Sequence, residues 1–344
     1  MKNIGFFLSF LLLTAVFSVG VFAAEEKSSG PETPDVCFDP AEEIDVIEEG
    51  ERRGAPAARA VAPVADFYTV RREGECFFLT DRDGTEIMQS GELQQLIDGA
   101  MAKAESVVFS FLSVSVDRSL NFSRGEIFLE GSLCFEGEAG LVLSDGGLTI
   151  EGDLLFSSGG IRIKEGFLHL TGGKIRSAGC AVTLDYSSAA RFEMSGGEIV
   201  STGEGAAVEN RLGTVSVSGG SIRNTAGYAV RSEGTLKLGG DAILDGEGTD
   251  VEATLPVTLT AQGIPFAGTL SVNLRKTFEK GRETPAFYGA VSGMETRISL
   301  TDASGGAMPL VFREKGKNTD EKSFLAVSLP YRYSCLLDGE EVFV

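Results

Sequence analysis

One glycine-punctuated motif recurs through the middle of the chain and constrains its fold more than any other feature. Each copy has apolar residues at alternate positions, then a glycine pair, then an isoleucine; the copies occupy residues 167–175, 191–199, 214–222 and 235–243. Their final isoleucines are 24, 23 and 21 residues apart. A shorter G-x-A-V element lies between copies, at residues 179–182, 205–208 and 227–230. The chain therefore contains imperfect repeats of nearly constant length.

The pattern within a copy predicts a strand with one buried face. Alternate side chains of a strand point to the same side, so the pairs Leu168/Leu170, Phe192/Met194, Val215/Val217 and Leu236/Leu238 should point inward. The glycine pair turns the chain, because glycine adopts positive φ without penalty. One copy cannot bury its own inward face, so copies must stack on one another.

We therefore predict an all-β fold, a right-handed parallel β-helix over residues 106–253, with about six coils spaced roughly 4.8 Å apart. A sandwich of antiparallel hairpins would also show alternation and turns, but it does not require the same glycine pair at a constant period. Residues between the inward positions should form outward columns. One column would hold His169, Glu193, Ser216 and Lys237, and another would hold Lys174, Glu198, Ser221 and Ala242.

The N-terminus indicates export. Lys2, an apolar run over residues 4–21 and the small-residue pattern ending at Ala23 predict a signal peptide over residues 1–23. An uncleaved membrane anchor is the alternative, because the run is nearly long enough to span a bilayer. After cleavage, we expect no transmembrane segment. Residues 24–65 are acidic and then rich in Ala and Pro, which predicts a disordered linker.

Residues 66–105 predict a short hairpin and a helix. Apolar residues at 67–70 and 76–79 flank turn-forming residues at 81–84. Leu93, Leu96, Ile97, Ala100 and Ala104 recur at three- and four-residue steps, which predicts an amphipathic helix over residues 91–105 with Ser90 as its N-cap.

The last part of the chain, residues 254–344, lacks the glycine pairs. Strand candidates remain at 256–260, 268–274, 296–300, 310–312 and 324–329. We predict a β-rich C-terminal module that caps the last coil or stands beside it.

The order of a helix, a β-rich start and copies of T-V-x-V-S-G-G-x-I alternating with G-x-A-V resembles the pectate-lyase-like right-handed β-helix superfamily. The likeness is strongest to its uncharacterised exported bacterial members described as adhesin-like surface proteins, and it covers residues 90–250. It implies that the helix caps the first coil. It specifies the fold well and the function poorly.

Charge and cysteine content narrow the function. A formal net charge of −20 argues against binding nucleic acid or anionic lipid. The five cysteines are Cys37, Cys76, Cys134, Cys180 and Cys335, and their spacing shows neither a disulfide framework nor a zinc site. A bridge between Cys37 and Cys76 is the one pairing that we consider. We expect no cofactor and no metal.

No catalytic constellation is visible, and we name no catalytic residue. The single histidine, His169, would need a partner such as Glu193 to act as a base. Glycoside cleavage requires two carboxylates within roughly 5–10 Å, but the acids of the repeats occur singly and lack the paired motifs of β-helix hydrolases.

For binding, the candidates are Tyr228, Tyr186, Glu193 and His169, because aromatic rings and nearby polar groups suit sugars and the chain has no tryptophan. We expect a secreted, cell-surface or periplasmic protein without catalytic activity, acting as an adhesin-like or structural module toward a glycan, envelope or host partner. A divergent polysaccharide lyase or glycoside hydrolase is the alternative, and a scaffold that only spaces other domains is a third reading.

Overall fold

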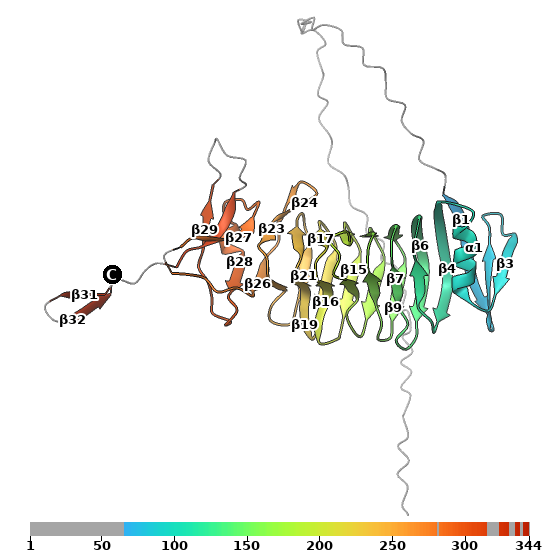
Figure 1. Cartoon of the computed structure of the whole chain (residues 1–344), viewed down its shortest axis with the longest axis horizontal. Helices are drawn as coiled ribbons and strands as arrows, with labels where there is room; N and C mark the ends of the chain where they lie inside the picture. Colours follow the sequence, from blue (N-terminus) through green and yellow to red (C-terminus); the bar gives the residue numbers. More distant parts are fainter. Residues whose placement is uncertain (1–64, 281, 315–322, 330–333, 338–339, 344) are drawn as a thin grey trace, which may run out of the picture. The chain divides into compact units, whose positions relative to one another are not determined.

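The computed structural model describes residues 65–280, 282–314, 323–329, 334–337 and 340–343. The predicted signal peptide and all but the last residue of the predicted linker lie outside these residues. Successive strands stack in parallel along one axis and form a solenoid of about eight turns (Figure 1). The predicted parallel β-helix is confirmed.

Each coil has three faces. The first face holds the first halves of β4 (Ser106–Val116) and β6 (Glu126–Phe135), then β8 (Gly147–Ile150), β11 (Phe167–Leu170), β14 (Arg191–Met194), β17 (Thr214–Val217), β20 (Thr235–Leu238), β23 (Val257–Thr258) and β27 (Thr284–Tyr288). The second face holds the second halves of β4 and β6, then β9 (Asp153–Phe156), β12 (Lys174–Ser177), β15 (Glu198–Ser201), β18 (Ser221–Asn224) and β21 (Ile243–Asp245).

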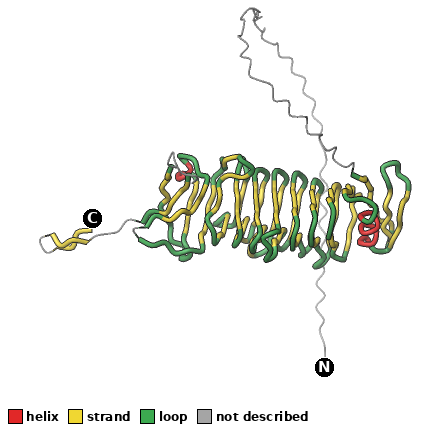
Figure 2. Tube along the Cα trace, turned by 45° about the horizontal axis from the view of Figure 1, so that its top comes forward, coloured by secondary structure: helices red, strands yellow, loops and turns green. Residues whose placement is uncertain are grey.

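The third face is a separate sheet. It holds β5 (Leu120–Phe122), β7 (Leu141–Leu143), β10 (Ile161–Ile163), β13 (Val182–Leu184), β16 (Gly205–Asn210), β19 (Gly227–Ser232), β22 (Val251–Ala253), β26 (Leu270–Leu274) and β28 (Ile298–Thr301). Figure 2 shows strands and turns alternating along the whole stack.

The core forms where the repeat predicts it. Leu170, Met194, Val217 and Leu238 are direct neighbours in adjacent coils, and each is fully buried. The outward column of His169, Glu193, Ser216 and Lys237 is likewise in register. On the second face, Lys174 forms the expected ion pair with Glu198. Alternation therefore assigned the inside of these strands correctly, but Ser216 of the predicted outward column is buried, at 5% exposed.

One register prediction was wrong. Ile243 was aligned with the inward isoleucines, yet it pairs with Ser221 and is 58% exposed, while Leu244 pairs with Ile222 and is 6% exposed. Ile243, and not Ala242, therefore ends the outward column of Lys174. In this copy the glycine pair directly follows Leu238, so the turn contains one more residue before the next strand.

The interior also holds a polar column that alternation did not predict. Ser177, Ser201 and Asn224 pair across β12, β15 and β18 and are all buried. Ser201 Oγ donates to the Gly179 carbonyl at 2.7 Å, and Asn224 Nδ2 donates to the Tyr228 carbonyl at 3.1 Å. These bonds satisfy buried backbone groups at the turn between the second and third faces.

A hairpin and a helix cover the N-terminal end. Strand β1 (Asp66–Glu73) pairs antiparallel with β2 (Cys76–Thr80) and parallel with β4, and β2 pairs with β3 (Glu86–Ser90). Helix α1 (Leu93–Met101) is shorter than predicted. Its N-cap residue is Glu92, and the Ser90 hydroxyl instead accepts the Glu92 amide at 3.1 Å. Leu96 and Ile97 are buried against the first coil, as the resemblance implied.

Parallel stacking continues beyond residue 253, where the glycine pairs end. β26 and β28 extend the third face, and β27 extends the first. A small hairpin, β24 (Thr260–Ala261) with β25 (Ile264–Pro265), interrupts the β23 coil. β29 (Leu310–Arg313) and β30 (Phe324–Val327) add antiparallel strands, η1 (Met294–Thr296) precedes β28, and β31 (Ser334–Leu337) pairs with β32 (Glu340–Phe343).

Candidate functional site

His169 and Glu193 lie side by side on the first face, as their shared column requires. The structure also places a residue there that sequence reasoning missed: Ser195 Oγ lies 3.0 Å from His169 Nε2. Glu193 Oε2 accepts a hydrogen bond at 3.1 Å from Nε2 of Gln262, which is at the tip of the β24–β25 hairpin. The one sequence signal that could have identified Ser195 is its position directly before a glycine pair.

A serine bonded to a histidine is part of a nucleophilic site, but such a site also needs a third group that orients the base. Within the described residues, His169 has no hydrogen bond to a carboxylate, and Glu193 instead accepts from Gln262. The contact therefore links two neighbouring coils without the geometry of a triad.

The two candidate tyrosines belong to the third face and do not meet His169 or Glu193. Tyr186 follows the end of β13 and is 72% exposed, with the Arg211 guanidinium 5.4 Å from its ring centre. Tyr228 lies near the start of β19, is half-buried, and has Arg231 at 5.3 Å from its ring. The structure thus separates the four predicted residues into three places.

A lateral groove of about 420 Å³ crosses the third face over β7, β10 and β13. Its floor is made of Gly140, Gly159, Gly160 and Cys180. A Cβ at Gly160 would lie 2.2 Å from the Cys180 carbonyl oxygen, and one at Gly159 would lie 2.1 Å from that of Ala139. Coils can pack this closely only with glycine here, so the shallow floor follows directly from the repeat.

Polar side chains line the groove and are held in place by ion pairs. Asp185 accepts from Arg162 at 2.6 Å and lies 3.7 Å from Arg211, whose other partner is Glu209 at 3.3 Å. Because Arg211 also stacks on Tyr186, the exposed ring and the groove form one continuous surface. We call this surface the Tyr186 groove.

Cys180 in the floor is not suited to nucleophilic chemistry. Burial raises the pKa of its thiol and outweighs the hydrogen bond that Thr183 Oγ1 donates to its sulfur at 3.4 Å, which lowers that pKa. The thiol therefore stays protonated near neutral pH. Cys76, Cys134 and Cys180 form no disulfide with one another; Cys37, the candidate partner of Cys76, lies outside the described residues.

The described residues contain no group of three or more His, Cys, Asp or Glu side chains placed to hold a metal ion. Their helices are too short or too polar to cross a bilayer.

Fold and site together define a parallel β-solenoid with a polar lateral surface. Comparison with known families adds one match: the haemagglutinin repeat, over residues 137–204 and 212–264. These segments cover less than half of the chain, and they include the groove floor and Tyr186. No curated protein and no solved structure matches the chain. Repeat and solenoid fit an adhesin-like or structural surface protein; the pectate-lyase-like superfamily is not confirmed.

Proposed function

We propose that this protein is exported by its first 23 residues and acts outside the cytoplasm as a non-catalytic adhesin-like module that binds a glycan in the Tyr186 groove. The observation that carries the proposal is the Tyr186 ring, 72% exposed beside a groove lined with hydrogen-bonding side chains. Haemagglutinin repeats, which are typical of surface or secreted adhesins, support the location.

The chemistry of the groove suits a sugar. A pyranose ring has an apolar face, which an exposed aromatic ring can cover, and hydroxyl groups that both donate and accept hydrogen bonds. Tyr186 supplies the ring, Arg162 and Arg211 supply donors, and Glu138 and Thr183 supply acceptors. The ion pairs restrict these side chains before a ligand arrives, which lowers the entropic cost of binding.

The charge of the groove favours a neutral glycan. Arg162 and Arg211 are matched by Asp185 and Glu209, and Glu138 adds a negative charge, so the groove has no excess positive charge to attract an anionic glycan. The chain as a whole carries a formal charge of −20, which repels polyanions. Adjacent coils are about 4.8 Å apart, so an extended chain lying along the stack would meet a new coil at short, regular intervals.

The test is a glycan array probed with the mature protein, followed by titration of the ligands found. Tyr186→Ala should weaken binding about tenfold, as loss of a central aromatic contact does. Tyr228→Ala is the matched control, because its ring is half-buried and lies near the start of β19, two strands from β13 on the third face. Loss of binding in Tyr228→Ala but not in Tyr186→Ala would contradict the proposed site.

A reducing-sugar assay on the same ligands separates the alternatives. Saturable release of oligosaccharide would replace the proposal with a lyase or hydrolase. Absence of any glycan ligand would leave the structural scaffold as the better description.

A further inference from the structure

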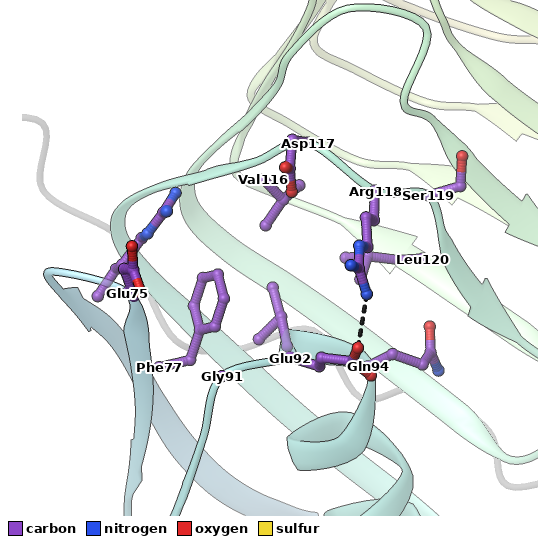
Figure 3. Close-up of a pocket in the computed structure, with 12 residues that line it drawn as sticks. Glu75, Phe77, Gly91, Glu92, Gln94, Val116, Asp117, Arg118, Ser119 and Leu120 are labelled. Carbon is purple, nitrogen blue, oxygen red and sulfur yellow. Dashed lines mark hydrogen bonds and ion pairs between the residues drawn. The ribbon is translucent and has the colours of Figure 1, made fainter.

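A second hollow, at the N-terminal end of the solenoid, is independent of the Tyr186 groove (Figure 3). It has a volume of about 420 Å³ and lies between the β1–β2 turn, the start of α1 and the connection from β4 to β5. Its floor is apolar: Phe77, Leu93, Val116 and Leu120 line it, and each is at most 6% exposed. Three separate segments therefore build a pocket of the size that small ligands occupy.

Both arginines of the rim are already engaged. Arg118 pairs with Glu92 at 2.5 Å, the contact drawn as a dashed line in Figure 3. The Arg72 guanidinium lies 5.2 Å from the centre of the Phe77 ring and donates to the Ser115 carbonyl at 2.7 Å and the Gly74 carbonyl at 3.1 Å. Arg118 therefore has an acidic partner, whereas Arg72 is bonded only to neutral carbonyls and keeps its positive charge at the rim.

Two carboxylates of the same pocket have no partner of this kind. Within the described residues, Glu75 and Asp117 form no ion pair and no side-chain hydrogen bond, although both line the hollow. The Glu92 carboxylate, which pairs with Arg118, belongs to the N-cap residue of α1. By formal charge, three carboxylates (Glu75, Glu92 and Asp117) face two guanidinium groups (Arg72 and Arg118), so the pocket presents an apolar floor and a rim with an excess of one negative charge.

From this arrangement we infer that the N-terminal pocket binds an alkylammonium group, that is, a short apolar chain ending in a primary amine. The chain would cover the floor at Phe77 and Val116, and the ammonium would lie at the rim with Glu75 and Asp117. A free diamine and a lysine side chain of a partner protein share this chemistry.

Isosteric probes of the mature protein test the charge preference. Isothermal titration with hexylamine, hexanol and hexanoate compares one apolar chain bearing a cation, a neutral group and an anion. Hexylamine should bind about two- to fivefold more tightly than hexanol, the size of effect that one exposed charge contact produces, and hexanoate should bind most weakly. The preference should shrink as salt is raised. Equal or tighter binding of hexanoate, or no binding of hexylamine at millimolar concentration, would overturn the inference.

Variants locate the site. Asp117→Asn and Glu75→Gln keep the shape of the rim and remove its charge, so the double variant should bind hexylamine no better than hexanol. Glu247→Gln, an exposed acid outside the pocket, is the control and should leave the preference unchanged. If the double variant keeps the preference, the amine binds elsewhere and the inference is wrong.

Two further probes identify the natural source. Tighter binding of cadaverine than of a capped Gly-Lys-Gly peptide would indicate a free diamine, and the reverse order would indicate a lysine of a partner. Glycan binding by the Tyr186 groove does not enter any of these measurements, so the two proposals can fail separately.

Discussion

At the scale of single residues, the side of the strand on which a side chain lies sets its contribution to stability. Ile243 and Leu244 are neighbours of similar size in β21, yet one is 58% exposed and the other 6% exposed. Burying a leucine side chain removes its apolar surface from water, and deleting it leaves a cavity besides. Truncating an exposed isoleucine removes little buried apolar surface and leaves no cavity.

We therefore expect Leu244→Ala to lower the free energy of unfolding by about 2–4 kcal/mol. Ile243→Ala should change it by no more than about 1 kcal/mol. Urea denaturation followed by circular dichroism measures both. The reverse order would restore the register that the repeat pattern suggested and contradict the pairing of Leu244 with Ile222.

At the scale of elements, the turns between strands depend on glycine for two separate reasons. Gly197 has φ +80°, and a Cβ there would lie 2.6 Å from the carbonyl oxygen of Gly172 in the neighbouring coil. Gly248 has nearly the same φ, +81°, but no atom lies within 4 Å of its would-be Cβ. A comparison of Gly197 with Gly248 therefore separates the cost of backbone strain from the cost of contact between coils.

Gly248→Ala should cost about 1–2 kcal/mol, the price of a left-handed conformation for an L-residue. Gly197→Ala should cost more than about 3 kcal/mol, because the backbones of two coils must also move apart. Thermal unfolding of the two variants checks the difference. Similar losses in both would mean that coils at the glycine pair are not packed as closely as the structure has them.

At the scale of the whole molecule, a stack of parallel strands must end without offering a free edge to other chains. At the N-terminal end, β1 covers part of β4, and α1 packs beside it through Leu96 and Ile97. At the other end, β29 and β30 switch to antiparallel pairing. The helix thus packs against the first coil, and we expect it to shield that coil.

Leu96→Asp places a charge at a fully buried position, so we expect α1 to detach and the uncovered first coil to associate with other copies. Sedimentation velocity should show larger species than for the unchanged chain. Gln95→Asp, on the exposed side of the same helix, is the control and should sediment like the unchanged chain. A Leu96→Asp variant that sediments like its control would show that the helix does not protect an edge.

Prediction from the sequence succeeded where one coil repeats another. The inward column through Leu170 and Met194, the outward column through His169 and Glu193 and the strand candidates of the C-terminal part all rest on alternation, which is local. It failed where spacing changes by one residue, as before Leu244. Residues 106–253 make seven coils, one for each of β4, β6, β8, β11, β14, β17 and β20, and not about six, because the first three coils, which begin at Ser106, Glu126 and Gly147, take only 20, 21 and 20 residues.

The candidate sites were less predictable for a physical reason. Tyr186 was a candidate because it is aromatic. Its place in the groove depends on Arg211, which lies 25 positions away in the sequence and contacts the ring only because adjacent coils stack. The floor of the groove is lined by glycines. A glycine has no side chain, so these residues do not mark a binding site in the sequence. The N-terminal pocket joins three segments whose contacts follow from the docking of the hairpin and helix.

The amino-acid sequence by itself determined the architecture: a period of 21 to 24 residues with a glycine pair and one apolar face per copy can bury that face only by stacking. Only the tertiary structure decided which outward side chains meet, where the groove and the pocket lie, and how the stack is closed. Residue type and spacing along the chain specify which side chains are buried. Which side chains of adjacent coils meet depends on the lengths of the turns, because one extra turn residue shifts the register of the next strand by one position.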